Sequence, residues 1–232
     1  MKREELKKLA GEKAVELIKD KMIVGLGTGS TVEYTIRKLG KKIRDEGLEI
    51  KGIPTSIHTK RLAKEEKIPL TTLEENPEID ITIDGADEVD SYLNLIKGGG
   101  GALTREKIIA FNSKKVIIVV DDSKVVKALG IDFDLPVEVV KFGWTSTKKS
   151  LEQFDCEVKL REIMENEPYI TDNGNYILDC EFERIDDPSE LEKEINNIPG
   201  VVENGLFVDL VDEVIAGGKQ GIVTLDKESA VV

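Results

Sequence analysis

Apolar residues recur along the first part of the chain with two different periods. Residues Glu4–Lys19 carry them three or four positions apart, which predicts an amphipathic helix. A short apolar run at Met22–Leu26 predicts a buried strand. A glycine-rich break follows, and a second helical pattern continues through Leu39 and Ile43. The chain therefore opens with helix, strand, glycine turn and helix.

The same alternation continues to about position 120. The patterns predict, in order, strand 50–54, helix 59–66, strand 79–83, helix 104–113 and strand 116–120. Such alternation is typical of an α/β domain with a mostly parallel, Rossmann-like sheet. Ligands of these sheets bind outside the carboxyl ends of the strands, so motifs that follow the strands are the candidates for a site.

The order of elements changes from about Asp132. We predict strand 136–142, helix 147–154, strand 157–162, a hairpin-like pair around 172–175, a helix after Pro188 and a strand near Val201. This βαββαβ order is the ferredoxin-like α+β signature. We therefore predict a ferredoxin-like domain at 132–204, inserted into a Rossmann-like domain formed by 1–131 and 205–232. Strand-like segments at 205–210 and 214–225 would return to the first sheet.

The acidic composition limits the kinds of partner. The 232 residues include 33 Lys or Arg and 46 Asp or Glu, which gives a net charge of −13 and a pI near 4.8. Nucleic-acid binding needs a basic face, so we expect no nucleic-acid partner. An anionic small substrate needs only local cations, and Lys97, Arg105, Lys107 and Lys124 stand close to the glycine motifs.

Targeting signals, thiols and histidine narrow the chemistry further. The first residues lack an apolar signal core and no stretch reaches the length of a membrane span, so we expect a cytoplasmic protein without a membrane partner. Cys156 and Cys180 have no metal-ligand or redox spacing and are expected to be buried or half-buried thiols. The single histidine, His58, lies in the turn-like stretch 54–58 and is expected on a surface loop. Acid–base chemistry is therefore left to carboxylates and lysines.

The segment Gly25–Thr31 (GLGTGST) lies between a predicted strand and a predicted helix. Backbone N–H groups and the helix dipole favour a phosphate there. Ser30 stands where a dinucleotide fingerprint needs its third glycine, and the Walker ending is absent. The alternative is a plain helix entry in which Ser30 and Glu33 form a capping box.

Two further motifs follow predicted strands. Asp84–Asp90 (DGADEVD) holds four acids, and it could be a solvated turn or a magnesium site. Its spacing matches no EF-hand and no histidine is nearby, so we expect no metal. Lys97–Lys107 (KGGGGALTREK) joins a lysine and four glycines to a helix that starts at Thr104, which puts Glu106 in the first turn. A flexible linker is the alternative to a binding loop.

Together, GTGST, DGADE, KGGGGALTREK and DDSK resemble, in order and spacing from Gly25 to Lys124, the ribose-5-phosphate isomerase A family. The predicted insertion agrees with that family's architecture. The resemblance implies interconversion of D-ribose 5-phosphate and D-ribulose 5-phosphate through an enediolate, in the non-oxidative pentose phosphate pathway, without a cofactor or metal.

The resemblance also implies the roles of individual residues. Glu106 would be the proton acceptor, and Lys97 would stabilise the developing oxyanion. Asp84 and Asp87 would handle hydroxyl protons during ring opening and isomerisation. The implied substrate contacts are Thr28, Gly29, Ser30, Thr31, Asp84, Gly85, Ala86, Asp87, Lys97, Gly98, Gly99, Gly100 and Lys124.

Three other functions compete with this hypothesis. An amino-sugar phosphate isomerase/deaminase relies on a catalytic histidine, and His58 lies outside the motifs. A coenzyme A transferase is a more distant relative, and the chain is short for one. A non-catalytic sugar-phosphate sensor would usually carry a DNA-reading element, and no helix-turn-helix precedes Gly25.

Exposed apolar strands in the smaller domain lead us to expect a homodimer or homotetramer.

Overall fold

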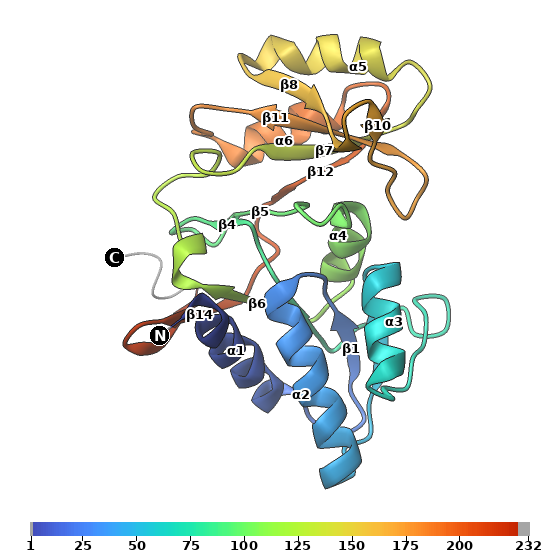
Figure 1. Cartoon of the computed structure of the whole chain (residues 1–232), viewed down its shortest axis with the longest axis vertical. Coiled ribbons are helices and arrows are strands. Elements are labelled where there is room, and N and C mark those ends of the chain that lie inside the picture. The colour runs from blue at the N-terminus through green and yellow to red at the C-terminus, as the bar shows by residue number, and fades with distance from the viewer. Residues whose placement is uncertain (1, 227–232) are drawn as a thin grey trace. The chain divides into compact units, whose positions relative to one another are not determined.

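The computed structural model of the chain describes residues 2–226 (Figure 1). Contacts between Cα atoms divide these residues into two compact units. The first unit comprises residues 2–86, 105–125 and 210–226, and the second comprises 87–104 and 126–209. Among the described residues, no helix has the length and apolar character needed to cross a membrane.

The first unit is built on a six-stranded sheet in the order β15-β14-β6-β3-β1-β2. Its strands are β1 (Ile23–Leu26), β2 (Lys51–Pro54), β3 (Ile81–Asp84), β6 (Val116–Asp121), β14 (Glu213–Gly218) and β15 (Gly221–Asp226). All neighbours pair in parallel except β14 and β15, which are antiparallel. The mostly parallel, Rossmann-like sheet predicted from the alternating elements is confirmed.

Helices pack on both faces of this sheet. They are α1 (Arg3–Ala14) with the short 3-10 helix η1 (Val15–Leu17), α2 (Ser30–Glu46), α3 (Ile57–Glu65) and α4 (Leu103–Phe111). Ala10 of α1 and Ile36 of α2 belong to one buried cluster with Val24 of β1. Ile109 of α4 belongs to another cluster with Ile53 of β2. Both faces of the sheet are therefore covered by helices. Because neighbouring strand residues point to opposite faces, both sets of side chains are buried, and each strand is a continuous run of apolar residues.

The second unit contains a four-stranded antiparallel sheet in the order β12-β7-β11-β8. Its elements are β7 (Leu135–Val139), α5 (Trp144–Leu151) with η3 (Glu152–Phe154), β8 (Glu157–Leu160), β11 (Tyr176–Glu181), α6 (Pro188–Asn196) and β12 (Val201–Asn204). The βαββαβ order is that of a ferredoxin-like α+β fold. It is inserted between β6 and β14, which are neighbours in the main sheet, as the sequence predicted.

A three-stranded sheet completes the second unit and was not predicted. It consists of β4 (Glu88–Val89), β5 (Leu95–Ile96) and β13 (Leu206–Phe207), all antiparallel. The tail therefore returns to the main sheet through β14 and β15, while the expectation for 205–210 is wrong because β13 pairs with β5. This pairing also places 87–104 in the second unit with 132–204. The division into folding domains at 132 and 204 stays a prediction.

The predicted hairpin around 172–175 is also wrong in detail. The turn at 171–175, in which Gly174 N donates to Thr171 O, precedes β11 and does not join it directly to β8. Between those strands lies a small hairpin formed by β9 (Glu162–Met164) and β10 (Glu167–Pro168). Two- and three-residue strands leave no recognisable period in a sequence, which is why this hairpin was missed.

Candidate active site

The turn after β1 leads directly into α2. Gly29 occupies the N-cap with φ of 128°, a conformation that favours glycine, and Ser30 is the first helical residue. The capping-box alternative is therefore wrong, because Ser30 lies inside the helix and the Glu33 carboxylate contacts His58 Nε2 at 3.3 Å. Glycine at the N-cap supplies no side-chain acceptor for the N–H groups of the first turn of α2. These N–H groups suit an anion.

The Thr28 hydroxyl belongs to a group of hydroxyls that the sequence reasoning missed. Its Oγ1 lies 2.8 Å from Thr55 Oγ1, 2.8 Å from Ser56 Oγ and 3.1 Å from Thr59 Oγ1. Ser56 is the N-cap of α3, where its side chain accepts from Thr59 N. The recognisable signal was the run of hydroxyl residues that directly follows β2.

Asp84 ends β3 and is almost completely buried, with 2 % of its surface exposed. Its Oδ1 accepts from Thr28 N at 3.0 Å and from Gly85 N at 2.7 Å. A Cβ at Gly27 would lie 2.1 Å from that oxygen, so the turn after β1 needs glycine to approach the carboxylate this closely. Thr28, Asp84 and Gly85 are thereby joined in the first unit, and Ala86 ends this stretch of the unit.

Asp87 and the glycine run come together in the second unit. The β4–β5 hairpin pairs Glu88 with Ile96, and Asp87 N donates to Ile96 O. This places the Asp87 carboxylate beside the run, where its Oδ2 accepts from Gly99 N at 2.8 Å. A Cβ at Gly99 would lie 2.8 Å from Asp87 Oδ1. The unpredicted hairpin thus explains why Asp87 of DGADE and Gly99 of KGGGG, 12 residues apart, form one arrangement.

The glycine run is an ordered turn. Gly101 N donates to Gly98 O at 2.9 Å, and both residues have positive φ values, of 74° and 108°. Glycine adopts such angles without strain, so the flexible-linker alternative does not describe this segment. Gly99 and Gly100 are exposed at the tip of the turn.

Lys97, which precedes the glycine run, is buried with 2 % of its surface exposed. Its Nζ lies 5.5 Å from the centre of the Phe207 ring, within the range of a cation–π interaction. Its backbone N donates to Gly205 O, which fixes the start of the run. A buried ammonium group acts more strongly on nearby negative charge than an exposed one, because less water screens it.

Glu106 lies in the first turn of α4, as predicted, with 4 % of its surface exposed. The start of this helix is held by Thr104, whose hydroxyl donates to Glu138 at 2.6 Å. Glu138 is fully buried on β7 and also accepts from Thr171, at 2.8 Å. Glu138 is 34 residues away from Thr104, so no local pattern could predict this support.

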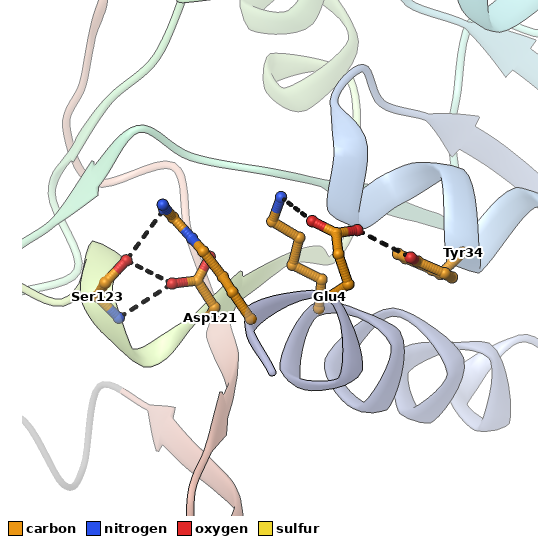
Figure 2. A network of polar contacts seen from close by, with 6 residues as sticks. Glu4, Tyr34, Asp121 and Ser123 are labelled. Atoms are coloured by element: carbon orange, nitrogen blue, oxygen red, sulfur yellow. Dashed lines mark hydrogen bonds and ion pairs between the residues drawn. The ribbon is translucent and has the colours of Figure 1, made fainter. Parts of the chain in front are cut away.

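Lys124 is half-buried at the end of the short 3-10 helix η2 (Asp122–Lys124), which follows β6. Figure 2 shows the hydrogen bonds that connect this turn to α1. Arg3 Nε donates to Asp121 Oδ2 and its Nη2 donates to Ser123 Oγ, both at 3.1 Å, while Ser123 N donates to Asp121 Oδ1. Burial raises the pKa of Asp121, but the hydrogen bonds from Ser123 and Arg3 outweigh it and leave the pKa below its ordinary value.

The same first turn of α1 also contacts α2. Tyr34 Oη and Lys7 Nζ each donate to the Glu4 carboxylate at 2.9 Å (Figure 2). The hydrogen bond from Lys7 and then that from Tyr34 hold the pKa of Glu4 below its ordinary value. This side of α1 therefore connects the helix after the first motif with the turn that carries Lys124.

His58 was expected on a surface loop, and the structure corrects this. It is exposed but lies in the first turn of α3, and its ring faces Glu33 of α2.

A separate hollow of about 530 Å³ is lined by residues of the first unit that include Ser56, Arg105 and Ile109. It contains none of the predicted substrate contacts. In the part of the chain that the structure describes, no group of three or more His, Cys, Asp or Glu side chains could hold a metal ion.

The predicted site residues are divided between the units. Thr28–Thr31, Asp84–Ala86, Glu106 and Lys124 lie in the first unit, and Asp87 and Lys97–Gly100 lie in the second. Contacts join Thr28 to Asp84 and Gly85 in one unit, and Asp87 to Gly99 in the other. Each unit thus presents a carboxylate held by backbone N–H groups, and the second adds a buried lysine.

Comparison with known proteins identifies one family. The family model for ribose 5-phosphate isomerase A (phosphoriboisomerase A) matches residues 51–221. Ribose-5-phosphate isomerase A 1 of Oceanobacillus iheyensis is 53 % identical over 94 % of this chain and 97 % of its own length. Ribose-5-phosphate isomerase A of Methanocaldococcus jannaschii is 50 % identical over 98 % of this chain and all of its own.

Solved structures agree with these sequence relatives. The structure of the Methanocaldococcus jannaschii enzyme superposes with a TM-score of 0.93 at 49 % identity, over 97 % of this chain and all of the other. A D-ribose-5-phosphate isomerase in complex with phospho-erythronic acid gives a TM-score of 0.95 at 45 % identity, with the same coverage. Both the sequence and the fold of this chain are therefore similar to those of this group of proteins along nearly their whole length.

Proposed function

Since the chain belongs to the ribose 5-phosphate isomerase A family, we propose that Glu106 carries the proton between two carbons of the substrate. The chain is an aldose–ketose isomerase that interconverts ribose 5-phosphate and ribulose 5-phosphate. This reaction removes a proton from C2 of the open-chain aldose and returns one to C1, with an enediolate between the two steps. A carboxylate near the substrate can perform both transfers.

The burial of Glu106 supports its assignment as the base. With 4 % of its surface exposed, its carboxylate is shielded from bulk water, and proton transfer to a nearby carbon competes less with solvent. The position in the first turn of α4 fixes its backbone, and the Thr104–Glu138 hydrogen bond secures the helix start. Both observations fit a residue that must hold one orientation through two proton transfers.

Lys97 stabilises the negative charge that develops on the substrate oxygen. It is buried, and its backbone is fixed at the start of the ordered glycine turn, so its charge is preorganised. Asp84 and Asp87 exchange hydroxyl protons during ring opening and isomerisation. Asp84 accepts from backbone N–H groups of Thr28 and Gly85, and Asp87 accepts from that of Gly99, so the position of each carboxylate is fixed.

The anionic substrate is held by backbone N–H groups and local cations. Gly29–Thr31 at the start of α2, together with Gly98 and Gly100, offer N–H groups, and Lys124 adds positive charge. Thr28 and Gly99 lie beside them, with their own N–H groups donated to Asp84 and Asp87. Gly85 and Ala86 complete the proposed contacts. A related D-ribose-5-phosphate isomerase was solved in complex with phospho-erythronic acid, which carries a phosphate and a carboxylate, and this supports an anionic sugar-phosphate substrate.

A homodimer or homotetramer in the cytoplasm is part of the same proposal. Phe142, Ile163 and Met164 of the second unit are 94 %, 62 % and 65 % exposed, which leaves apolar surface that a second copy can cover. Light scattering after size exclusion tests the assembly, and a mass of 25.7 kDa would contradict it. Fractionation of cells that express the tagged chain tests the compartment.

One assay tests the function. The purified protein is incubated with ribose 5-phosphate and a chelator, and ketose formation is followed over time. Ketose should form at the same rate with and without the chelator, because the proposed groups are all side chains and backbone N–H groups. Absence of product would support a non-catalytic sugar-phosphate sensor. Activity that returned only with added metal would overturn the proposed chemistry.

A further inference from the structure

Arg161 lies between β8 and β9 and is held by a carboxylate of the neighbouring strand. Its Nε donates to Asp179 Oδ2 at 2.9 Å and its Nη2 donates to Asp179 Oδ1, so the pair is bidentate. Both side chains are largely buried, with 15 % and 17 % of their surface exposed. A bidentate pair of this kind fixes the plane of the guanidinium group and therefore the direction of its remaining donors.

The remaining donor of Arg161 points at the glycine turn. Nη1 donates to Gly98 O at 2.7 Å and to Gly99 O at 3.2 Å. Tyr169 adds a third hydrogen bond, from its Oη to Gly100 O at 3.2 Å, and the Arg161 Cζ lies 6.0 Å from the centre of its ring. Two side chains of the ferredoxin-like fold thus hold three successive carbonyl groups of the turn.

The first of these carbonyls belongs to the peptide that contacts Asp87. In a planar trans peptide, the C=O of one residue and the N–H of the next point in opposite directions. The Gly98–Gly99 peptide accepts from Arg161 at its oxygen and donates from its nitrogen to Asp87 Oδ2 at 2.8 Å. A continuous chain of hydrogen bonds therefore runs from Asp179 through Arg161 and this peptide to Asp87. Charge at one end polarises the peptide and strengthens the bond at the other.

We propose that Arg161 is a positioning residue that acts through the Gly98–Gly99 peptide to orient Asp87 for the isomerase reaction. The proposal rests on the role given above to Asp87. Without the guanidinium group, the peptide loses the contact that sets its plane, and four consecutive glycines offer little resistance to its rotation. The inserted fold would thereby contribute directly to proton transfer.

The test compares variants that separate positioning from folding. Removing Arg161 alone leaves Asp179 buried without its partner, which destabilises proteins strongly, whereas replacing both members of a buried pair by apolar residues is often neutral. The central variant is therefore the double replacement Arg161→Met with Asp179→Leu, and Arg161→Lys retains the charge but not the fixed fork. Arg184→Met is the matched control, because Arg184 pairs with Asp186 in the same unit but both are exposed.

The double variant should lower kcat on the order of 10-fold to 100-fold while KM changes less than threefold, because orientation at the reacting centre is lost. Arg161→Lys should fall between the double variant and the unchanged protein, and Arg184→Met should match the unchanged protein. In nuclear magnetic resonance spectra the Gly99 amide proton should shift upfield in the double variant. A folded double variant with kcat within twofold of the unchanged protein, or with an unmoved Gly99 resonance, would overturn the proposal.

Asp87→Asn, measured beside these variants, separates this inference from the assignment on which it rests. Loss of turnover in Asp87→Asn together with normal turnover in the double variant rejects only the role of Arg161. Normal turnover in Asp87→Asn rejects the role of Asp87, and with it the route from Arg161 through the peptide.

Discussion

Replacing Gly27 with alanine tests how closely Asp84 must be held. The added Cβ would lie 2.1 Å from Asp84 Oδ1 and 2.5 Å from its Cα, where ordinary contact begins at 3.4 Å. The carboxylate oxygen would therefore have to retreat by about 1.3 Å, and the Asp84 Cα by about 0.9 Å. The hydrogen bonds from Thr28 N and Gly85 N, now 3.0 and 2.7 Å long, would stretch beyond their useful range.

The expected effect on Gly27→Ala is large in activity and moderate in stability. A displacement of about 1 Å at a reacting group can reduce the rate about 100-fold, so we expect kcat/KM for ribose 5-phosphate to fall on that order. Overpacking costs about 1–3 kcal/mol, which lowers Tm by about 2–12 °C in a chain of this size. Ketose formation and thermal unfolding measure the two effects.

Gly85→Ala is the stability control for this experiment, since its added Cβ would approach other atoms no closer than 3.6 Å. Its Tm should stay within about 2 °C of the unchanged protein. If Gly27→Ala folds and keeps kcat/KM within threefold, the close hold on Asp84 is not needed for the reaction, and the reasoning from its geometry fails.

Three further predictions concern groups that support the site. Because the folded pKa of Asp121 is lowered, the free energy of unfolding of Arg3→Met, measured in urea, should be about 1 kcal/mol lower than that of the unchanged protein at pH 7. This difference should shrink as the pH falls below the unfolded pKa of about 4, and it should vanish only below the lowered folded pKa, where Asp121 is protonated in both states. The free energy of unfolding of Glu138→Met, measured in the same way, should be about 3–5 kcal/mol lower, because the buried donors around Glu138 lose their acceptor. In Glu138→Gln the decrease should be about 1–2 kcal/mol. The hydrogen bond from Cys180 lowers the pKa of Cys156, whereas the same contact and burial raise the pKa of Cys180. Iodoacetamide should therefore alkylate Cys156 before Cys180, and mass spectrometry measures the order.

Each of these has a clear contrary outcome. A constant loss in Arg3→Met from pH 7 to pH 3 would show that the lost contact is not with the charged form of Asp121. Equal losses in the two Glu138 variants would remove the argument from hydrogen-bond donors. Faster alkylation of Cys180 would contradict the order of the two thiols.

Periodicity in the sequence predicted the larger elements because their apolar runs are long. The strands of the main sheet are buried on both faces, so each appears as an unbroken apolar run followed by a polar motif. The glycine turn, Asp84 and the start of α4 were located for the same reason, since each directly follows or precedes such an element. Sequence reasoning therefore found the residues that stand at element ends.

Features that depend on distant parts of the chain could not be found in this way. Arg161 contacts Gly98, which is 63 residues away, and nothing near Arg161 marks it as a partner of the glycine run. The β4–β5 hairpin that brings Asp87 to Gly99 consists of two-residue strands, too short to show a period. The hydroxyl residues that directly follow β2 were a local signal that was overlooked, because serine, here Ser56, is a preferred N-cap residue.

Isotope exchange tests most directly whether Glu106 transfers the proton between C2 and C1 of the substrate. Ribose 5-phosphate is incubated with the unchanged protein and with Glu106→Gln in deuterated water, and deuterium at C1 of ribulose 5-phosphate is followed by nuclear magnetic resonance. We expect Glu106→Gln still to bind substrate in calorimetry, but to isomerise and exchange on the order of 10²-fold to 10⁴-fold more slowly. Exchange by Glu106→Gln at the rate of the unchanged protein would show that Glu106 is not the base and that another residue transfers the proton.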